Sequence, residues 1–94
     1  MTDNEMTDEE IIKDRANKYG PAKRCFETWS SMCEILSQYA KESGNVNPAH
    51  LYALKMNLLK IVRSAWNPNI EDNYKDGRNY LTIAHQCVEQ KKGK

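Results

Sequence analysis

Apolar residues recur at alternating intervals of three and four along two long stretches of this chain, and that spacing forms one continuous face only on an α-helix. In residues 21–42 the row consists of Ala22, Cys25, Trp29, Met32, Leu36 and Tyr39. In residues 48–66 it consists of Leu51, Leu54, Leu58, Ile61 and Ala65. No segment alternates polar and apolar residues as a strand does, so the sequence predicts an all-α protein.

Capping signals divide the chain into one short N-terminal helix and three longer ones, which predicts a small four-helix bundle. Thr7 followed by Glu10 is a capping box that begins the first helix. The signals between the helices are Gly20-Pro21, Ser43-Gly44-Asn45, Asn47-Pro48 and Asn67-Pro68. Gly20 suits the left-handed position that follows a helix. The last helix is expected to begin near Asp72, with its carboxylate as the cap. Gly77 inside it costs about 1 kcal/mol relative to alanine, for which close approach of another backbone would compensate.

The helix in residues 48–66 is expected to lie at the centre of the bundle. A second apolar row, made of Tyr52, Leu59, Val62 and Trp66, runs beside the first one. A helix that is apolar over so much of its circumference is usually contacted from two sides.

The length of 94 residues predicts one domain over residues 1–94, with an acidic flexible tail at 1–6 and a basic flexible tail at 90–94. A net charge of +1 argues against a dedicated nucleic-acid binder, which is usually strongly basic. The three cysteines include no C-x-x-C pair and predict reduced thiols. No apolar run reaches the ~20 residues that cross a bilayer and no leader is apparent. We therefore expect a cytoplasmic protein without membrane contact.

Two pairs of charged residues suggest phosphate and metal chemistry. Asp72 and Asp76 lie four residues apart on one helical face, where two carboxylates could share a Mg²⁺ ion. The alternative is an N-cap and a first-turn acid that complement the helix dipole. Lys60 and Arg63 lie three apart and could hold a phosphate, or they could belong to the solvated side of an amphipathic helix.

Aromatic residues and arginines suggest a different activity, the binding of a protein partner. The candidates for partner contact are Tyr52, Trp66, Tyr74, Arg63 and Arg78. Tyrosine, tryptophan and arginine dominate the energetics of protein interfaces. The alternative is that the aromatic residues at helical spacing simply belong to the core.

Several short motifs resemble a family of small phage and prophage proteins of uncharacterised function, often described as MazG-like. The matching positions are Arg15, Tyr19, Gly20, Lys60, Ile61, Arg63, Asn67, Pro68, Asp72, Tyr74 and Asp76. The resemblance implies a phage origin and a helical bundle distantly similar to all-α nucleoside triphosphate pyrophosphohydrolases. Those enzymes hold Mg²⁺ with helix-borne Glu-x-x-Glu and Glu-x-x-Asp carboxylates. The full acidic metal site is missing here, because residues 53–57 (ALKMN) contain no acid.

These observations lead to two functional hypotheses of different classes. The first is a non-catalytic phage protein without a cofactor that binds and modulates a host protein in the host cytoplasm, a host-takeover type of interaction. The alternative is a Mg²⁺-dependent nucleoside triphosphate pyrophosphohydrolase or nucleotide-binding protein of the MazG-like type. Homodimerisation is a further expectation, since two helices have apolar faces wide enough to form an intermolecular bundle.

Overall fold

A computed structural model describes residues 6–92 of the chain, with side chains described for residues 6–89. Within that part the elements are α1 (Asp8–Tyr19), α2 (Ala22–Ser43), α3 (Pro48–Trp66) and α4 (Glu71–Lys92). The predicted all-α fold of one short and three longer helices is confirmed. Of the predicted tails, residues 1–5 and 93–94 lie outside the described part, while the backbone of residues 90–92 continues α4. No described helix combines the length and the apolar content needed to cross a membrane.

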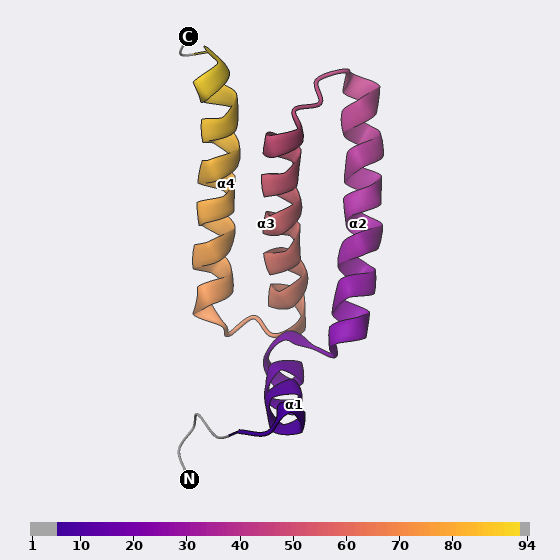
Figure 1. The fold of residues 1–94 in the computed structure, drawn as a ribbon, viewed down its shortest axis with the longest axis vertical. Helices are drawn as coiled ribbons and strands as arrows, with labels where there is room; N and C mark the ends of the chain where they lie inside the picture. The colour runs from indigo at the N-terminus through magenta and orange to yellow at the C-terminus, as the bar shows by residue number, and fades with distance from the viewer. Residues whose placement is uncertain (1–5, 93–94) are drawn as a thin grey trace.

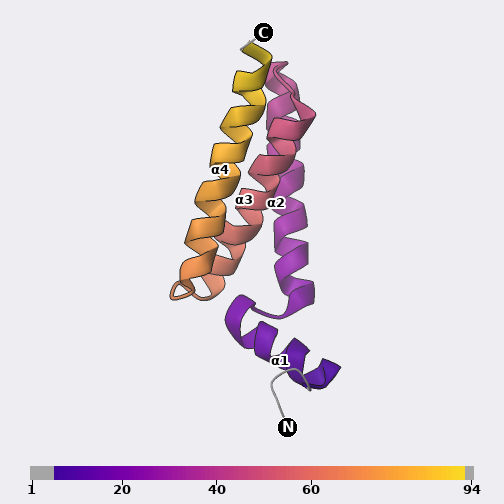
Figure 2. The ribbon, with the colours of Figure 1, turned by 60° about the vertical axis from the view of Figure 1, so that its left-hand side comes forward.

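Helices α2, α3 and α4 lie side by side in one layer with α3 in the middle, and α1 lies across one end of this layer (Figure 1). Figure 2 shows the same layer turned by 60°, with α1 still projecting from its end. Helix α3 contacts both neighbours, as predicted, whereas α2 and α4 do not contact one another over the described residues. With three helices in one row, α2 and α4 cover two sides of α3. The sides of α3 that face out of the layer have no covering helix along most of their length (Figure 1).

The predicted capping residues begin the helices through the expected hydrogen bonds. The Glu10 backbone N–H donates to Thr7 Oγ1 at 3.1 Å, and the Thr7 N–H donates back to Glu10 Oε1 at 3.0 Å. At the start of α3, Asn47 Oδ1 accepts from the His50 N–H at 3.1 Å, and Pro48 occupies the first helical position. Each cap satisfies N–H groups that a helix cannot pair internally.

The capping box of α1 predicts a dependence of this helix on pH. The hydrogen bond from the Thr7 N–H, followed by the one with its hydroxyl, holds the pKa of Glu10 below its ordinary value of 4.5. Because the folded pKa is lowered, the cap stabilises α1 fully above pH 4.5 and loses this effect as the pH falls through the folded pKa. We expect the protection factors of α1 amides against hydrogen exchange to fall over that range. In Glu10→Gln, which keeps the hydrogen bond without a titrating group, this fall should be smaller.

Two predicted details of the helix ends and one contact differ in the structure. Gly20 ends α1 with φ 88° and ψ 165°, which is an extended positive-φ conformation rather than the left-handed helical one. Helix α4 begins at Glu71, so Asp72 lies in its first turn rather than at the cap. Close approach does occur at Gly77, but by side chains of α3: a Cβ there would lie 2.8 Å from Asn57 Oδ1 and 3.7 Å from Lys60 Cβ.

The buried part of this layer is small. The buried apolar residues of the described chain are Cys25, Ala53, Leu59 and Ala84, and Asn73 is buried beside them. None of these apolar side chains is large except Leu59. Helix α4 reaches α3 over Gly77, opposite Asn57 and Lys60, so the seam uses polar side chains of α3. The main apolar row of α3 is therefore left outside the α3–α4 seam.

Candidate functional site

Two grooves flank α3 on the same side of the layer. One lies between α2 and α3 with a volume of about 330 Å³, and the other between α3 and α4 with a volume of about 390 Å³. Ile61 lines both grooves, so both open on the side of α3 that Ile61 occupies. We call this side the open face and define it by six groove-lining residues: Met32, Ile61, Ala65, Trp66, Tyr74 and Leu81.

The open face continues along α3 beyond the grooves. Leu58 and Leu54 precede Ile61 by three and seven residues and thus lie on the same side of the helix. Ile61 is 48% exposed and Trp66 is 58% exposed, although both belong to residue types that usually lose most of their surface on folding. Within the apolar stripe of α3, Ile61 and Ala65 are exposed, whereas the preceding leucines are half-buried. The open part of the stripe is therefore its C-terminal end.

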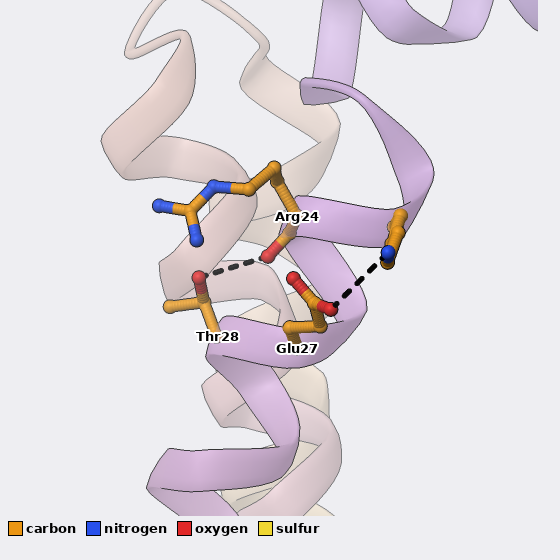
Figure 3. Close-up of polar contacts among 4 residues, drawn as sticks. Arg24, Glu27 and Thr28 are labelled. Atoms are coloured by element: carbon orange, nitrogen blue, oxygen red, sulfur yellow. Dashed lines mark hydrogen bonds and ion pairs between the residues drawn. The ribbon is translucent and has the colours of Figure 1, made fainter.

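Two arginines lie beside this apolar surface. Arg24 lines the α2–α3 groove and Arg78 lines the α3–α4 groove. Figure 3 shows that the Arg24 guanidinium points away from Glu27, whose carboxylate lies 3.9 Å from Lys23 Nζ. The Arg24 carbonyl accepts a hydrogen bond from Thr28 Oγ1 at 2.8 Å. Neither arginine has a carboxylate within 4.0 Å among the described residues, so the edges of the open face carry positive charge.

The structure brings together three of the five residues predicted to contact a partner. Trp66, Tyr74 and Arg78 all line the grooves of the open face. Tyr52 and Arg63 lie elsewhere: they line neither groove and are set about 180–200° around α3 from Ile61. The hypothesis of partner contact through these five residues is not tested by this placement, which puts the first three along the two grooves.

On the opposite side of α3, Arg63 meets α1. Its Cζ lies 4.7 Å from the centroid of the Tyr19 ring, and Arg15 Cζ lies 5.4 Å from the same centroid. These three residues line a cavity of about 240 Å³ where α1 and α2 join, which we call the junction pocket. The Arg63 Nε is buried and has no hydrogen-bond partner. Of the two residues predicted to bind phosphate, Arg63 therefore lines the junction pocket, whereas Lys60 lies outside it and pairs with Asp76 of α4.

The carboxylates proposed for Mg²⁺, Asp72 and Asp76, lie near the start of α4, where Asp76 pairs with a lysine of α3. Asp76 Oδ2 lies 3.2 Å from Lys60 Nζ, and the Lys60 side chain is only 14% exposed. No group of three or more His, Cys, Asp or Glu residues able to hold a metal ion occurs among the described residues. The assignment of Asp72 and Asp76 to Mg²⁺ and of Lys60 to phosphate stays a prediction, in which the Lys60–Asp76 ion pair would have to open.

The sequence was compared with known proteins. Residues 5–88 match a protein family described as "Domain of unknown function (DUF6378)". The chain belongs to the DUF6378 family. No curated protein and no solved structure matches it. The DUF6378 match extends from before α1 to Val88 near the end of α4, so it includes the open face and the junction pocket.

The three cysteines of this DUF6378 chain are free thiols. Cys25 is buried, and Cys33 and Cys87 are half-buried. Burial raises the pKa of the Cys33 thiol, and the nearby Lys55 opposes this only in part. A thiol with a raised pKa stays protonated at neutral pH and is a poor nucleophile.

Arg15 and Tyr19 line the junction pocket of the DUF6378 chain but are not among the partner, phosphate or metal residues predicted from the sequence. Both are positions of the MazG-like motifs, and their spacing of four residues places them on one face of α1. Their approach to Arg63, 44 residues after Tyr19, depends on the direction in which α1 leaves α2. That direction is set by the backbone at Gly20, where φ is 88°.

Proposed function

We propose that this DUF6378 chain is a non-catalytic helical module of phage origin that binds and modulates a host protein through its open face. The observation that supports the proposal is the exposed C-terminal end of the apolar stripe of α3, in which Ile61 is 48% exposed at the centre of two grooves. Contiguous exposed apolar surface on a water-soluble domain usually marks an interaction site.

The surface area of the chain supports the same conclusion. The chain exposes 7312 Å², whereas a folded monomer of 10.9 kDa exposes about 5,600 Å² by the scaling of surface with mass. The surplus of roughly 1,700 Å² is about twice the ~800 Å² that each partner contributes to a standard protein interface, and it is distributed over an elongated molecule of 54 × 27 × 22 Å. Covering this surface would give the three-helix layer the second layer that a helical domain normally has.

The grooves and their charges define the chemistry of a suitable partner. A groove between two neighbouring antiparallel helices (Figure 1) can accept an amphipathic helix through side chains at spacings of three and four residues. Arg24 and Arg78, which lack carboxylate neighbours among the described residues, favour acidic residues beside the apolar stripe of that helix. Trp66 and Tyr74 supply aromatic area of the kind that dominates binding energy. We therefore infer an acidic amphipathic helix as the bound element.

A second copy of the chain is the other candidate for the open face. Two layers packed face to face would bury Ile61 and Leu81 against the same face of the second copy, as in a two-fold interface. Sedimentation velocity separates the two cases. A monomer at high concentration would favour the host protein, and a dimer that Ile61→Asp converts to monomer would favour self-association through this face.

The alternative enzymatic function makes a prediction that a turnover assay can check. A panel of nucleoside and deoxynucleoside triphosphates with Mg²⁺ or Mn²⁺ is expected to yield no pyrophosphate release. Asp76→Asn should only remove the partner of Lys60, at a cost of at most about 1 kcal/mol because Asp76 is half exposed. Metal-dependent release that is lost in Asp76→Asn would instead establish an enzyme with Asp76 as a metal ligand.

A further inference from the structure

The junction pocket has walls of two kinds. Its apolar part comes from Ile12 and Ala16 of α1 and from Phe26 of α2, and its polar part from Arg15, Tyr19 and Arg63. Its volume of about 240 Å³ is smaller than that of a typical drug-sized ligand site. The space suits a small charged group attached to a single ring-sized body.

Two guanidinium groups lie near the Tyr19 ring, and neither has an acid beside it. Because Arg15 Cζ lies 5.4 Å and Arg63 Cζ 4.7 Å from the same ring centroid, the two cations are no more than about 10 Å apart. Neither has a carboxylate within 4.0 Å among residues 6–89, and the neighbouring Asp14 lies 3.3 Å from Lys18 Nζ. Two like charges held together in this way repel each other until an anion joins them.

The hydrogen-bonding groups of Arg63 also lack partners. The Arg63 Cζ lies over the Tyr19 ring, and a guanidinium has five N–H donors at its edge. The Nε atom is inaccessible to solvent and has no acceptor, although buried polar groups in folded proteins are nearly always paired. An oxyanion that accepts from the guanidinium edge would remove this deficit, because arginine binds phosphate through two parallel N–H groups.

The geometry points to a binding site for a small phosphate monoester, with the phosphate between Arg15 and Arg63 and its aromatic or aliphatic body on Ile12 and Phe26. This site adjoins the α2–α3 groove, with which it shares Tyr19, Gly20 and Cys25, but its two arginines line neither groove of the open face and the inference does not rest on the proposed function. It does not use Lys60, which is paired with Asp76. The bound anion would fasten α1 to α3, since each helix supplies one of the two arginines.

The test uses the full chain and phenyl phosphate as the probe, with inorganic phosphate and phenol as partial probes. Binding is followed by the ¹H–¹⁵N signals of the arginine Nε–H groups. We expect phenyl phosphate to shift the Arg15 and Arg63 signals and to bind at least about tenfold more tightly than either partial probe. Equal affinity for all three probes, or no shift at millimolar phenyl phosphate, would overturn the site.

Variants locate the binding to this pocket. Arg15→Gln and Arg63→Gln are each expected to weaken phenyl phosphate binding at least about tenfold through loss of a charge-assisted hydrogen bond. Arg24→Gln and Arg78→Gln, the matched arginines of the open face, should leave it unchanged. Should Arg63→Gln fail to fold, the exposed Arg15 still decides the matter. Binding retained in Arg15→Gln, or lost equally in Arg24→Gln, contradicts the assignment.

Discussion

Replacement of Ile61 by aspartate is expected to abolish association of this protein through its open face while leaving its helices intact. Ile61 lies between the two grooves, so a partner that fills either groove must cover it. Burial of an unpaired carboxylate and loss of the isoleucine together cost about 3 kcal/mol, a weakening of more than about a hundredfold. Affinity capture of the wild-type partner, or the dimer dissociation constant, measures the effect.

The matched control for this variant is Ile83→Asp. Ile83 is 45% exposed, close to the 48% of Ile61, but it lines neither groove. Both substitutions lower helix propensity by the same amount, so circular dichroism should report similar thermal midpoints for the two proteins. Loss of association in both variants, or in neither, would mean that the open face is not the docking surface.

Gly20→Ala is expected to destabilise the fold by about 3 kcal/mol. The backbone at Gly20 has φ 88° and ψ 165°, a region that residues with a Cβ rarely occupy. The added Cβ would also lie 3.0 Å from Trp66 Cδ2 and 3.1 Å from its Cγ, and the indole ring cannot bend away as a flexible side chain would. Equilibrium unfolding in urea, followed by circular dichroism, measures the loss.

Gly44→Ala separates the two causes of this loss. Gly44 also has positive φ, 75°, but no atom lies within 4 Å of the position of an added Cβ. Only the backbone cost remains there, and we expect about 1 kcal/mol. If Gly20→Ala were no more damaging than Gly44→Ala, the packing of the α1–α2 turn against Trp66 would contribute nothing to stability.

The local features of the fold could be predicted because they depend on nearby residues. Thr7 and Glu10 form the predicted capping box. Asn47 caps α3, and Pro48 occupies its first helical position. The central place of α3 also followed from its two apolar rows. Caps and stripes require no knowledge of distant residues.

The side on which α4 packs could not be predicted from the same stripes. Helix α4 approaches the polar Asn57 and Lys60 because Gly77 offers no side chain there and Asp76 reaches the lysine. The C-terminal end of the apolar row, which includes Ile61, is left open as a result. A hydrophobic pattern shows which side chains favour burial, but it does not show whether they are buried within the chain or against a partner.

The junction pocket could not be predicted for a different reason. Arg15 and Tyr19 were visible as a pair on one helix, but their meeting with Arg63 depends on the angle between α1 and α3. One unusual backbone conformation at Gly20 sets that angle, and the sequence alone indicated a different, left-handed helical end.

Photocrosslinking from position 61 tests the central claim most directly. A photoreactive phenylalanine analogue is placed at position 61 and, in a second protein, at position 83, and both are irradiated in the host cell. We predict a discrete protein adduct from position 61 and none from position 83, with the mass of the adduct showing whether the partner is a host protein or a second copy. Absence of any adduct at position 61, or the same adducts from both positions, would contradict an open face that docks a protein.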